Sequence, residues 1–401
     1  MKNSNINELN KSNSTINTKN KTSFEIFVKN VNKKLVHCTK GTIMLANSVL
    51  EAITNKDMKK LNEICENGLS DDLPILRAYV WKIILGYLPI DYDKWDETFS
   101  QKRKQYDIYK SFIKEKLKKE MEEKEYRNKE MLEQIIKDVY RTNAELSFFF
   151  QSTDKSKTFN NEELLKILDK RKNWDFSNIN DIYKYDNIEN ETHADVLSRI
   201  LFTYSIIIKD VSYHQGMNEI LAPIYYCYSY DKLYIEENEK DIEADSFWSF
   251  FSLMNEIKSN FNIEQDGLFL KSKILGECLK IIDKKLFTKL EEKNVKTEYY
   301  SLRWFMMLFS QDFNIGDILK LWDLIFCGRK KNYFMFYISL GIIKYRENEI
   351  INGDLAQILK CFQDLNDILC DDIIFIAKEL KNNYSSEIDP IIAKSEKELN
   401  L

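Results

Sequence analysis

The stretch "LPILRAYVWKIILGYLP", from Leu73 to Pro89, decides the fold class of this chain. Its apolar side chains recur every three or four positions, as on one face of a helix, and a proline stands near each end. The residues of that face are Leu76, Val80, Ile83, Ile84 and Tyr87. A proline is tolerated in the first turn of a helix and cannot continue one, so the stretch predicts a single amphipathic helix.

Two further stretches show the same period. After Thr192, where Thr-His-Ala-Asp has the pattern of a capping box, an apolar stripe continues to Ile208. After Gly353, with Asp354 as a candidate N-cap, another stripe continues to Leu369. The chain has only ten glycines and four prolines in 401 residues, too few for the frequent turns of an all-β sandwich or barrel. These patterns predict an all-α fold.

Composition and charge narrow the class of protein. With 44% hydrophobic residues, the chain can bury a large core, as one extended domain or as two sub-domains. Its net charge of −5 gives no basic field for nucleic acid, which favours a protein partner. The seven cysteines are scattered and odd in number, which is typical of reduced thiols in a cytosolic protein. His37, His193 and His214 are far apart in sequence, so we expect no metal site.

Several segments favour a cytoplasmic location with no integral membrane segment. Residues 1–22 are rich in Asn, Lys, Ser and Thr and lack an apolar stretch, which predicts a disordered polar tail. The most apolar run, Tyr333 to Ile343, is shorter than the roughly 20 residues of a membrane span. Charges of both signs fill Lys114 to Glu130, which we interpret as a solvated helix or an exposed connector.

The stretch "IIKDVYRT", from Ile135 to Thr142, places an arginine at the end of a core helix. At about 100° per residue, Leu132, Ile135 and their apolar neighbours fall on one face, and Arg141 lies opposite and points outward. Asp138, three residues earlier, is close enough on the helix surface to hold the guanidinium. Taken alone, this pattern is typical of an ordinary surface ion pair.

The stretch "YHQGMNE", from Tyr213 to Glu219, follows the helix that begins after Thr192. Gly216 permits a backbone conformation that other residues resist, so the loop can present Gln215 to a partner. Taken alone, Gln215 could equally serve as a capping or turn side chain.

Together the two stretches resemble the TBC-domain family of Rab GTPase-activating proteins. The family's I-x-x-D-x-x-R segment is matched by Ile135, Asp138 and Arg141, and its Y-x-Q-G-M segment by Tyr213, Gln215, Gly216 and Met217. Further blocks resemble the family at 68–89, 193–204 and 302–326. Within these blocks we interpret six residues as buried scaffold rather than partner contacts: Arg77, Trp81, Arg199, Trp304, Trp322 and Asp323.

The resemblance implies a Rab-GAP TBC-type helical domain with two helical sub-domains. The expected organisation is a polar tail at 1–22, a helical extension at 23–67, the TBC domain at 68–330 with the charged connector 114–130, and C-terminal helices at 331–401 that complete the second sub-domain.

The implied function is activation of a Rab-family small GTPase in its GTP-bound form, not an enzyme activity of the chain alone. Arg141 would be an arginine finger and Gln215 a glutamine finger, with Asp138 and Tyr213 positioning them. No G-x-x-x-x-G-K-[ST] occurs, so we expect no cofactor of its own, and GTP and Mg²⁺ would belong to the partner. Membrane contact would come only through the Rab, peripheral to endomembranes. The alternatives are a catalytically silent helical adaptor that binds a small GTPase and, on composition alone, an unrelated helical scaffold.

Overall fold

The computed structural model describes residues 21–123, 127–142, 147–154, 162, 166, 191–208, 212–230, 239–261, 266–327 and 333–399. Every regular element in these ranges is helical, apart from one isolated antiparallel bridge between Ser152 and Thr192. The prediction of an all-α fold is confirmed. None of the helices described is long and apolar enough to cross a membrane.

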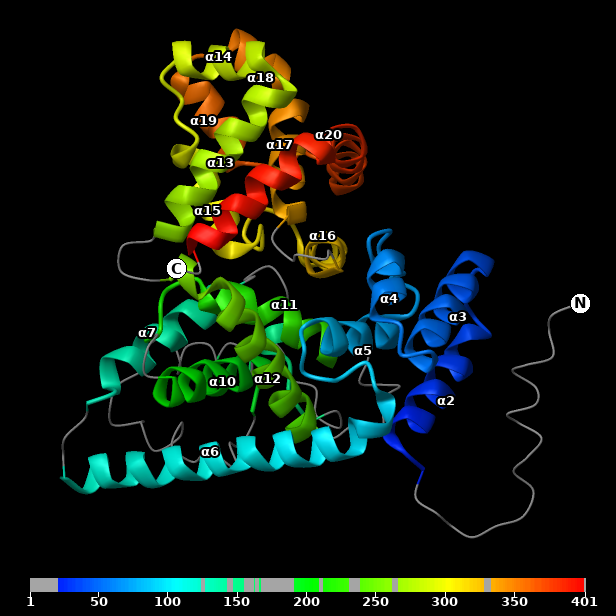
Figure 1. The fold of residues 1–401 in the computed structure, drawn as a ribbon. Coiled ribbons are helices and arrows are strands. Elements are labelled where there is room, and N and C mark those ends of the chain that lie inside the picture. The colour runs from blue at the N-terminus through cyan, green and yellow to red at the C-terminus, as the bar shows by residue number, and fades with distance from the viewer. Residues whose placement is uncertain are drawn as a thin grey trace, which may run out of the picture.

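The first sub-domain, the lower group of helices in Figure 1, is built around α10 and α11. The longest of its helices, α6, runs along the outer edge of this group and packs against α10 and α12. The helices of this sub-domain are α2 (Ser23–Leu35), α3 (Lys40–Thr54), α4 (Met58–Cys65), α5 (Pro74–Ile84), α6 (Trp95–Glu123), α7 (Lys129–Val139), α10 (His193–Ile207), α11 (Met217–Ser229) and α12 (Glu239–Ile257), with 3₁₀ turns at Tyr92–Lys94, Ser147–Phe150 and Lys258–Asn260.

The second sub-domain, the upper group in Figure 1, is formed mainly by the C-terminal part of the chain. Its centre is α17, an almost entirely buried helix that packs along α20. The helices of this sub-domain are α13 (Asp266–Ile282), α14 (Lys284–Glu292), α15 (Glu298–Met307), α17 (Tyr333–Tyr345), α18 (Glu347–Asn352), α19 (Leu355–Gln363) and α20 (Cys370–Leu399).

One helix, α16 (Ile315–Cys327), lies between the two groups and joins them (Figure 1). It contacts α4, α5 and α11 on one side and α17 and α20 on the other. Both sub-domains therefore share one continuous apolar core, which passes through α16.

A buried ion pair ties α16 to α5. The carboxylate of Asp323 accepts from Arg77 at 3.0–3.1 Å, from the indole Nε1 of Trp81 at 2.8 Å and from the backbone N–H of Leu69 at 3.0 Å. Burial raises the pKa of Asp323, and the adjacent Arg77 guanidinium opposes that rise. The side chains of Arg77, Trp81 and Asp323 are 2% exposed or less, which agrees with their interpretation as buried scaffold residues.

The local signals at helix starts are present as the sequence predicts. Thr192 and Asp195 form a capping box at the start of α10, and Asp354 forms another at the start of α19. Arg199 of α10 is largely buried and is paired with Glu243 at 2.7–2.8 Å, which also fits a scaffold role.

The sequence pattern was wrong about the extent of the C-terminal stripe. α19 ends at Gln363, although the apolar spacing continues to Leu369. Arg346 explains the break, because it binds the carbonyl of Asp364 at 3.2 Å and the carboxylate of Asp367, and so holds the chain in a turn.

Of the charged connector 114–130, residues 114–123 continue α6. Within them Leu117 and Glu120 are buried, so one face of this segment packs against the core. Of the expected tail at 1–22, residues 1–20 lie outside the described ranges, and Thr22 is the N-cap of α2.

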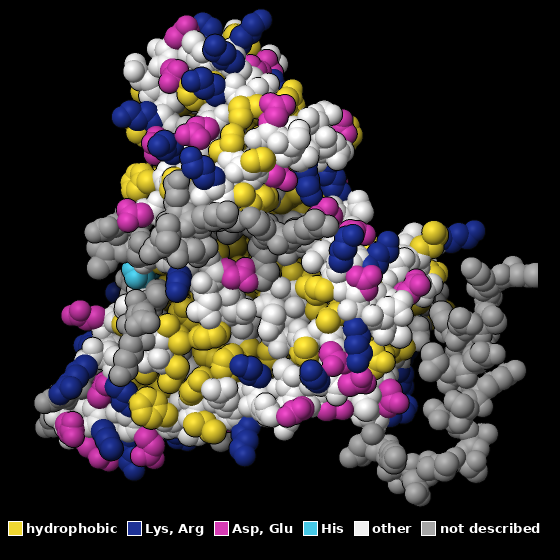
Figure 2. Space-filling model, in the orientation of Figure 1, with side chains coloured by type: hydrophobic (Ala, Val, Ile, Leu, Met, Phe, Trp, Pro, Cys, Tyr) yellow, Lys and Arg dark blue, Asp and Glu magenta, His cyan; other side chains and the backbone are white. Residues whose placement is uncertain are grey.

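The surface carries both signs of charge. On the face drawn in Figure 2, Lys and Arg side chains are interspersed with Asp and Glu over both sub-domains, without a broad region of one sign. In the described ranges, no three His, Cys, Asp or Glu side chains gather as candidate ligands for a metal ion.

Candidate functional site

The candidate site begins at the C-terminal end of α7. This helix is amphipathic, and Leu132, Ile135, Ile136 and Val139 are buried on its inner face. At its end Asp138 is 2% exposed, whereas the side chain of Arg141 is 65% exposed, pointing outward as predicted. The guanidinium is nevertheless fixed at its base, because its Nε donates to the carbonyl of Lys137 at 3.2 Å and its Nη2 binds the carboxylate of Asp138.

The second part of the site is the loop that enters α11, residues 212–216, which we call the glutamine loop. Gln215 is exposed, and Gly216, the N-cap of α11, is buried with φ of +107°. The positive φ favours glycine at position 216, and an added Cβ, 2.5 Å from Sδ of Met307, would displace the flexible end of that side chain. The glutamine is thus presented from a backbone that is held in one shape.

The carboxylate of Asp138 joins these two parts. It accepts from the side-chain amide of Gln134 at 2.9 Å, from Arg141 and from the hydroxyl of Tyr213 at 2.9 Å. Burial and the neighbouring Asp138 carboxylate raise the pKa of Tyr213 far above its ordinary value, so the phenol stays protonated and acts as a donor. One buried carboxylate therefore contacts both the arginine and the loop that carries the glutamine.

Two residues of the site, Asn218 and Glu219, were not singled out by the sequence patterns. Both are buried in the first turn of α11. Oδ1 of Asn218 accepts from the backbone N–H of Gly216 at 3.1 Å, and its Nδ2 donates to Oγ1 of Thr142 at 2.6 Å. The available signal was the polar Asn-Glu pair at the start of an otherwise apolar helix.

Glu219 connects the site to the second sub-domain. Its carboxylate accepts from Asn218 at 3.2 Å and hydrogen-bonds the side chain of Gln311, which lies in the turn between α15 and α16. Burial raises the pKa of Glu219 to about 7, and the nearby Asp138 adds to the rise. The carboxyl group of Glu219, with a pKa near neutrality, therefore lies in the buried part of the site.

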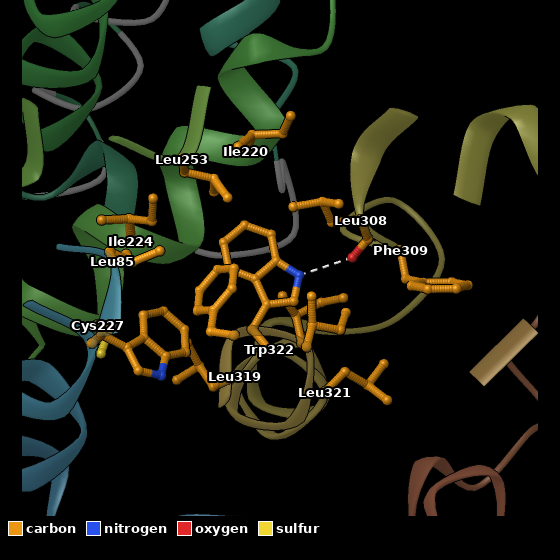
Figure 3. Close-up of a cluster of buried hydrophobic side chains, with 14 of the residues drawn as sticks. Leu85, Ile220, Ile224, Cys227, Leu253, Leu308, Phe309, Leu319, Leu321 and Trp322 are labelled. Atoms are coloured by element: carbon orange, nitrogen blue, oxygen red, sulfur yellow. Dashed lines mark hydrogen bonds between the residues drawn. The ribbon is translucent and has the colours of Figure 1, made fainter. Parts of the chain in front are cut away.

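The turn that carries Gln311 has an unusual backbone. Leu308 and Phe309 are non-glycine residues with positive φ, 51° and 63°, a conformation that costs on the order of 1 kcal/mol each. Figure 3 shows the indole of Trp322 pointing at the carbonyl of Leu308, to which its Nε1 donates at 2.8 Å. The same view places Ile220 and Ile224 of α11 around that indole. Trp322 is thus a buried scaffold residue, and so is Trp304.

Hydrogen bonds join Asp138 to Arg141 and to Tyr213, which precedes Gln215 by two residues in the loop. Ile135 is buried on the inner face of α7, and Gly216 shapes the loop. The two side chains that extend into solvent are a cation and a carboxamide, Arg141 and Gln215. Such a pair can stabilise negative charge and orient a water molecule on a bound partner.

Comparison with known proteins finds a family match over the part of the chain that contains the glutamine loop. The family model described as the Rab-GTPase-TBC domain matches residues 175–351, which contain Tyr213, Gln215 and Gly216. The "TBC1 domain family member 13" of Homo sapiens is 27% identical over 394 residues, covering 81% of this chain and 94% of that protein. The "GTPase-activating protein GYP7" of Candida glabrata is 25% identical over 309 residues, covering 76% of this chain and 37% of that protein.

A solved structure agrees at the level of fold. The crystal structure of the Ypt/Rab-GAP domain of Gyp1p has a TM-score of 0.62 and 20% sequence identity, covering 90% of this chain and 98% of that chain. The sequence blocks, the helical architecture and these matches lead to one assignment. The chain carries a domain of the TBC family of Rab GTPase-activating proteins, matched over residues 175–351.

Proposed function

We propose that this chain accelerates GTP hydrolysis by a GTP-bound Rab-family GTPase, to which it supplies Arg141 and Gln215 in trans. The observation that carries the proposal is the buried carboxylate of Asp138, which contacts both Arg141 and the tyrosine of the glutamine loop. The family match supports GTPase activation in general, and the assignment of the two side chains rests on the motif resemblance together with this geometry.

Arg141 would act on the charge that develops during hydrolysis. In the transition state, negative charge spreads over the oxygens of the γ-phosphoryl group, and an arginine inserted from outside accelerates hydrolysis by about 10³–10⁵-fold. The planar guanidinium can donate to two phosphate oxygens at once, which an ammonium cannot do in the same geometry. The exposed side chain of Arg141 can reach a partner. Its contacts with Lys137 and Asp138 already restrict its orientation, so binding costs less conformational entropy.

Gln215 would orient the attacking water. A carboxamide can accept from the water through its oxygen and donate through its nitrogen, and so fix the direction of attack. GTP and Mg²⁺ would be held by the Rab, in keeping with the lack of a phosphate-binding G-x-x-x-x-G-K-[ST] motif in this sequence. The site of action would be cytoplasmic, at the surface of the endomembrane on which the Rab is anchored.

Phosphate release from a panel of GTP-loaded Rabs tests the proposal. The parent should accelerate hydrolysis by at least one Rab, and Arg141→Ala, Arg141→Lys and Gln215→Ala should each lower that rate by about 10²-fold or more. Arg127→Ala is the matched control. Arg127 is an exposed arginine just before the N-terminus of α7, whereas Arg141 follows the C-terminal end of that helix. The control variant should retain the parental rate.

Two results would count against the proposal. Full acceleration by Arg141→Ala would remove the finger assignment. Tight binding of a GTP-loaded Rab by the parent without any acceleration would replace the activator with a silent adaptor.

A further inference from the structure

The side-chain amide of Asn218 bridges the two segments that carry the proposed fingers. It is 4% exposed, and its hydrogen bonds reach backbone groups on both segments, 2 residues away on one side and 80 residues away on the other. The family resemblance and the sequence patterns assign no role to this residue.

On the side of the glutamine loop, Oδ1 of Asn218 accepts from the backbone N–H of Gly216 at 3.1 Å. It also lies 3.2 Å from the hydroxyl of Tyr213. The N–H of Gly216 directly follows Gln215 in the chain, so this bond fixes the peptide from which the glutamine side chain is presented. Gly216 has no Cβ to restrict its own backbone, so an external hydrogen bond is needed to hold it.

On the side of the arginine, Nδ2 of Asn218 donates to Oγ1 of Thr142 at 2.6 Å and to the carbonyl of Asp138 at 3.3 Å. That carbonyl also accepts from the backbone N–H of Arg141 at 3.1 Å and from Oγ1 of Thr142 at 3.0 Å. The amide of Asn218 thus hydrogen-bonds the last turn of α7 at the carbonyl of Asp138, the same carbonyl that accepts from the backbone N–H of Arg141.

The orientation of the amide follows from these backbone partners. The N–H of Gly216 can only donate and the carbonyl of Asp138 can only accept. An amide rotated by 180° would therefore oppose donor to donor on one side and acceptor to acceptor on the other. The carboxyamide of Asn218 fits both sides at once, which neither aspartate nor a hydrophobic residue can do.

We propose that Asn218 is a positioning residue that sets the backbone spacing between Arg141 and Gln215, and so governs the rate of hydrolysis rather than the binding of the Rab. The inference rests on the proposed function. The contact between Tyr213 and Asp138 joins the same segments through side chains, whereas Asn218 joins them through the backbone. Both fingers must meet one γ-phosphate, and a displacement of about 1 Å can cost about 10²-fold in rate.

The test uses the full chain with a GTP-loaded Rab that the parent accelerates. Asn218→Ala should lower kcat by about 10²-fold and leave KM for the Rab within about threefold, because the exposed surface is unchanged. Hydrogen exchange at the Gly216 amide should become about tenfold faster, since the amide loses its acceptor. This second readout needs no GTPase.

The control is Asn260→Ala. Asn260 is also a buried asparagine, and its side chain hydrogen-bonds Lys271 and the carbonyl of Phe305, neither of which belongs to α7 or the glutamine loop. Measured below the melting transition, it should keep the parental kcat. If Asn218 were only a structural residue, both variants would retain kcat when folded.

Thr142→Val is the second variant, in case Asn218→Ala fails to fold. It removes the 2.6 Å acceptor of Nδ2 while keeping the shape of the side chain, and it should lower kcat by about tenfold with KM unchanged. Unchanged kcat in the folded variants, or a loss confined to KM, would overturn the positioning role. The proposed function fails separately, through an Arg141→Ala variant that keeps the parental rate.

Discussion

Glu219→Gln is expected to stabilise the protein at neutral and alkaline pH. The carboxyl group has a pKa of about 7 in the folded chain, against an ordinary value of 4.5, because burial disfavours its charged form. The folded chain therefore binds the proton more tightly than the unfolded chain. Stability contributed by this group is highest below pH 4.5 and is lost as the pH rises to 7. Glutamine has nearly the same shape and never ionises.

The magnitude follows from the two pKa values. At about 1.4 kcal/mol for each tenfold change in proton affinity, the cost of ionising Glu219 in the folded chain is about 1 kcal/mol at pH 5 and about 3 kcal/mol at pH 8. The variant should exceed the parent in unfolding free energy by those amounts. Asp312, whose pKa burial raises to about 6, titrates in both proteins and cancels from the difference.

Urea denaturation of parent and variant at pH 5, 6, 7 and 8 measures this difference directly. Glu63→Gln is the control, because that side chain is 53% exposed and an exposed charge contributes little. A gain for Glu219→Gln that is the same at every pH, or a loss that grows with pH, would refute the reasoning. Either result would mean that Asn218 and Gln311 hold the carboxylate well enough to offset its burial.

Two further substitutions test the scaffold of the site. Asp323→Ala should lose about 3–5 kcal/mol of unfolding free energy, because it removes the buried carboxylate paired with Arg77 and leaves only the exposed Asp71 carboxylate at 2.8 Å. A loss under 1 kcal/mol in urea denaturation would contradict the role given to the Arg77–Asp323 pair. Gly216→Ala should lose about 1–3 kcal/mol, because alanine is strained at φ of +107° and its Cβ displaces the side chain of Met307. An unchanged melting temperature would show that the loop can relax.

Much of the fold was readable from the sequence because its signals are local. The spacing from Leu76 to Tyr87 depends only on the period of a helix, and the capping boxes at Thr192 and Asp354 depend on residues three positions apart. These interactions form wherever the residues occur in a helix. The exposed position of Arg141 at the end of α7 follows from the same period.

The contacts that assemble the site were not readable in this way, because their partners are distant in the chain. Asp323 meets Arg77 across 246 positions, and Asn218 meets Thr142 across 76. No periodic pattern specifies such pairs, so the sequence could predict which residues matter only through resemblance to a family. Glu219 was overlooked for a related reason, since a glutamate at a helix start usually faces solvent and complements the helix dipole.

The second sub-domain supports the site even though both proposed fingers belong to the first. Met307 packs on Gly216, and the turn after it carries Gln311 to Glu219. That turn contains two strained residues, so it needs contacts that hold it, and the bond from Trp322 to the carbonyl of Leu308 is one of them. Trp322 belongs to α16, which packs in turn on α17 and α20. Through α16, this chain of contacts connects the glutamine loop to the C-terminal helices.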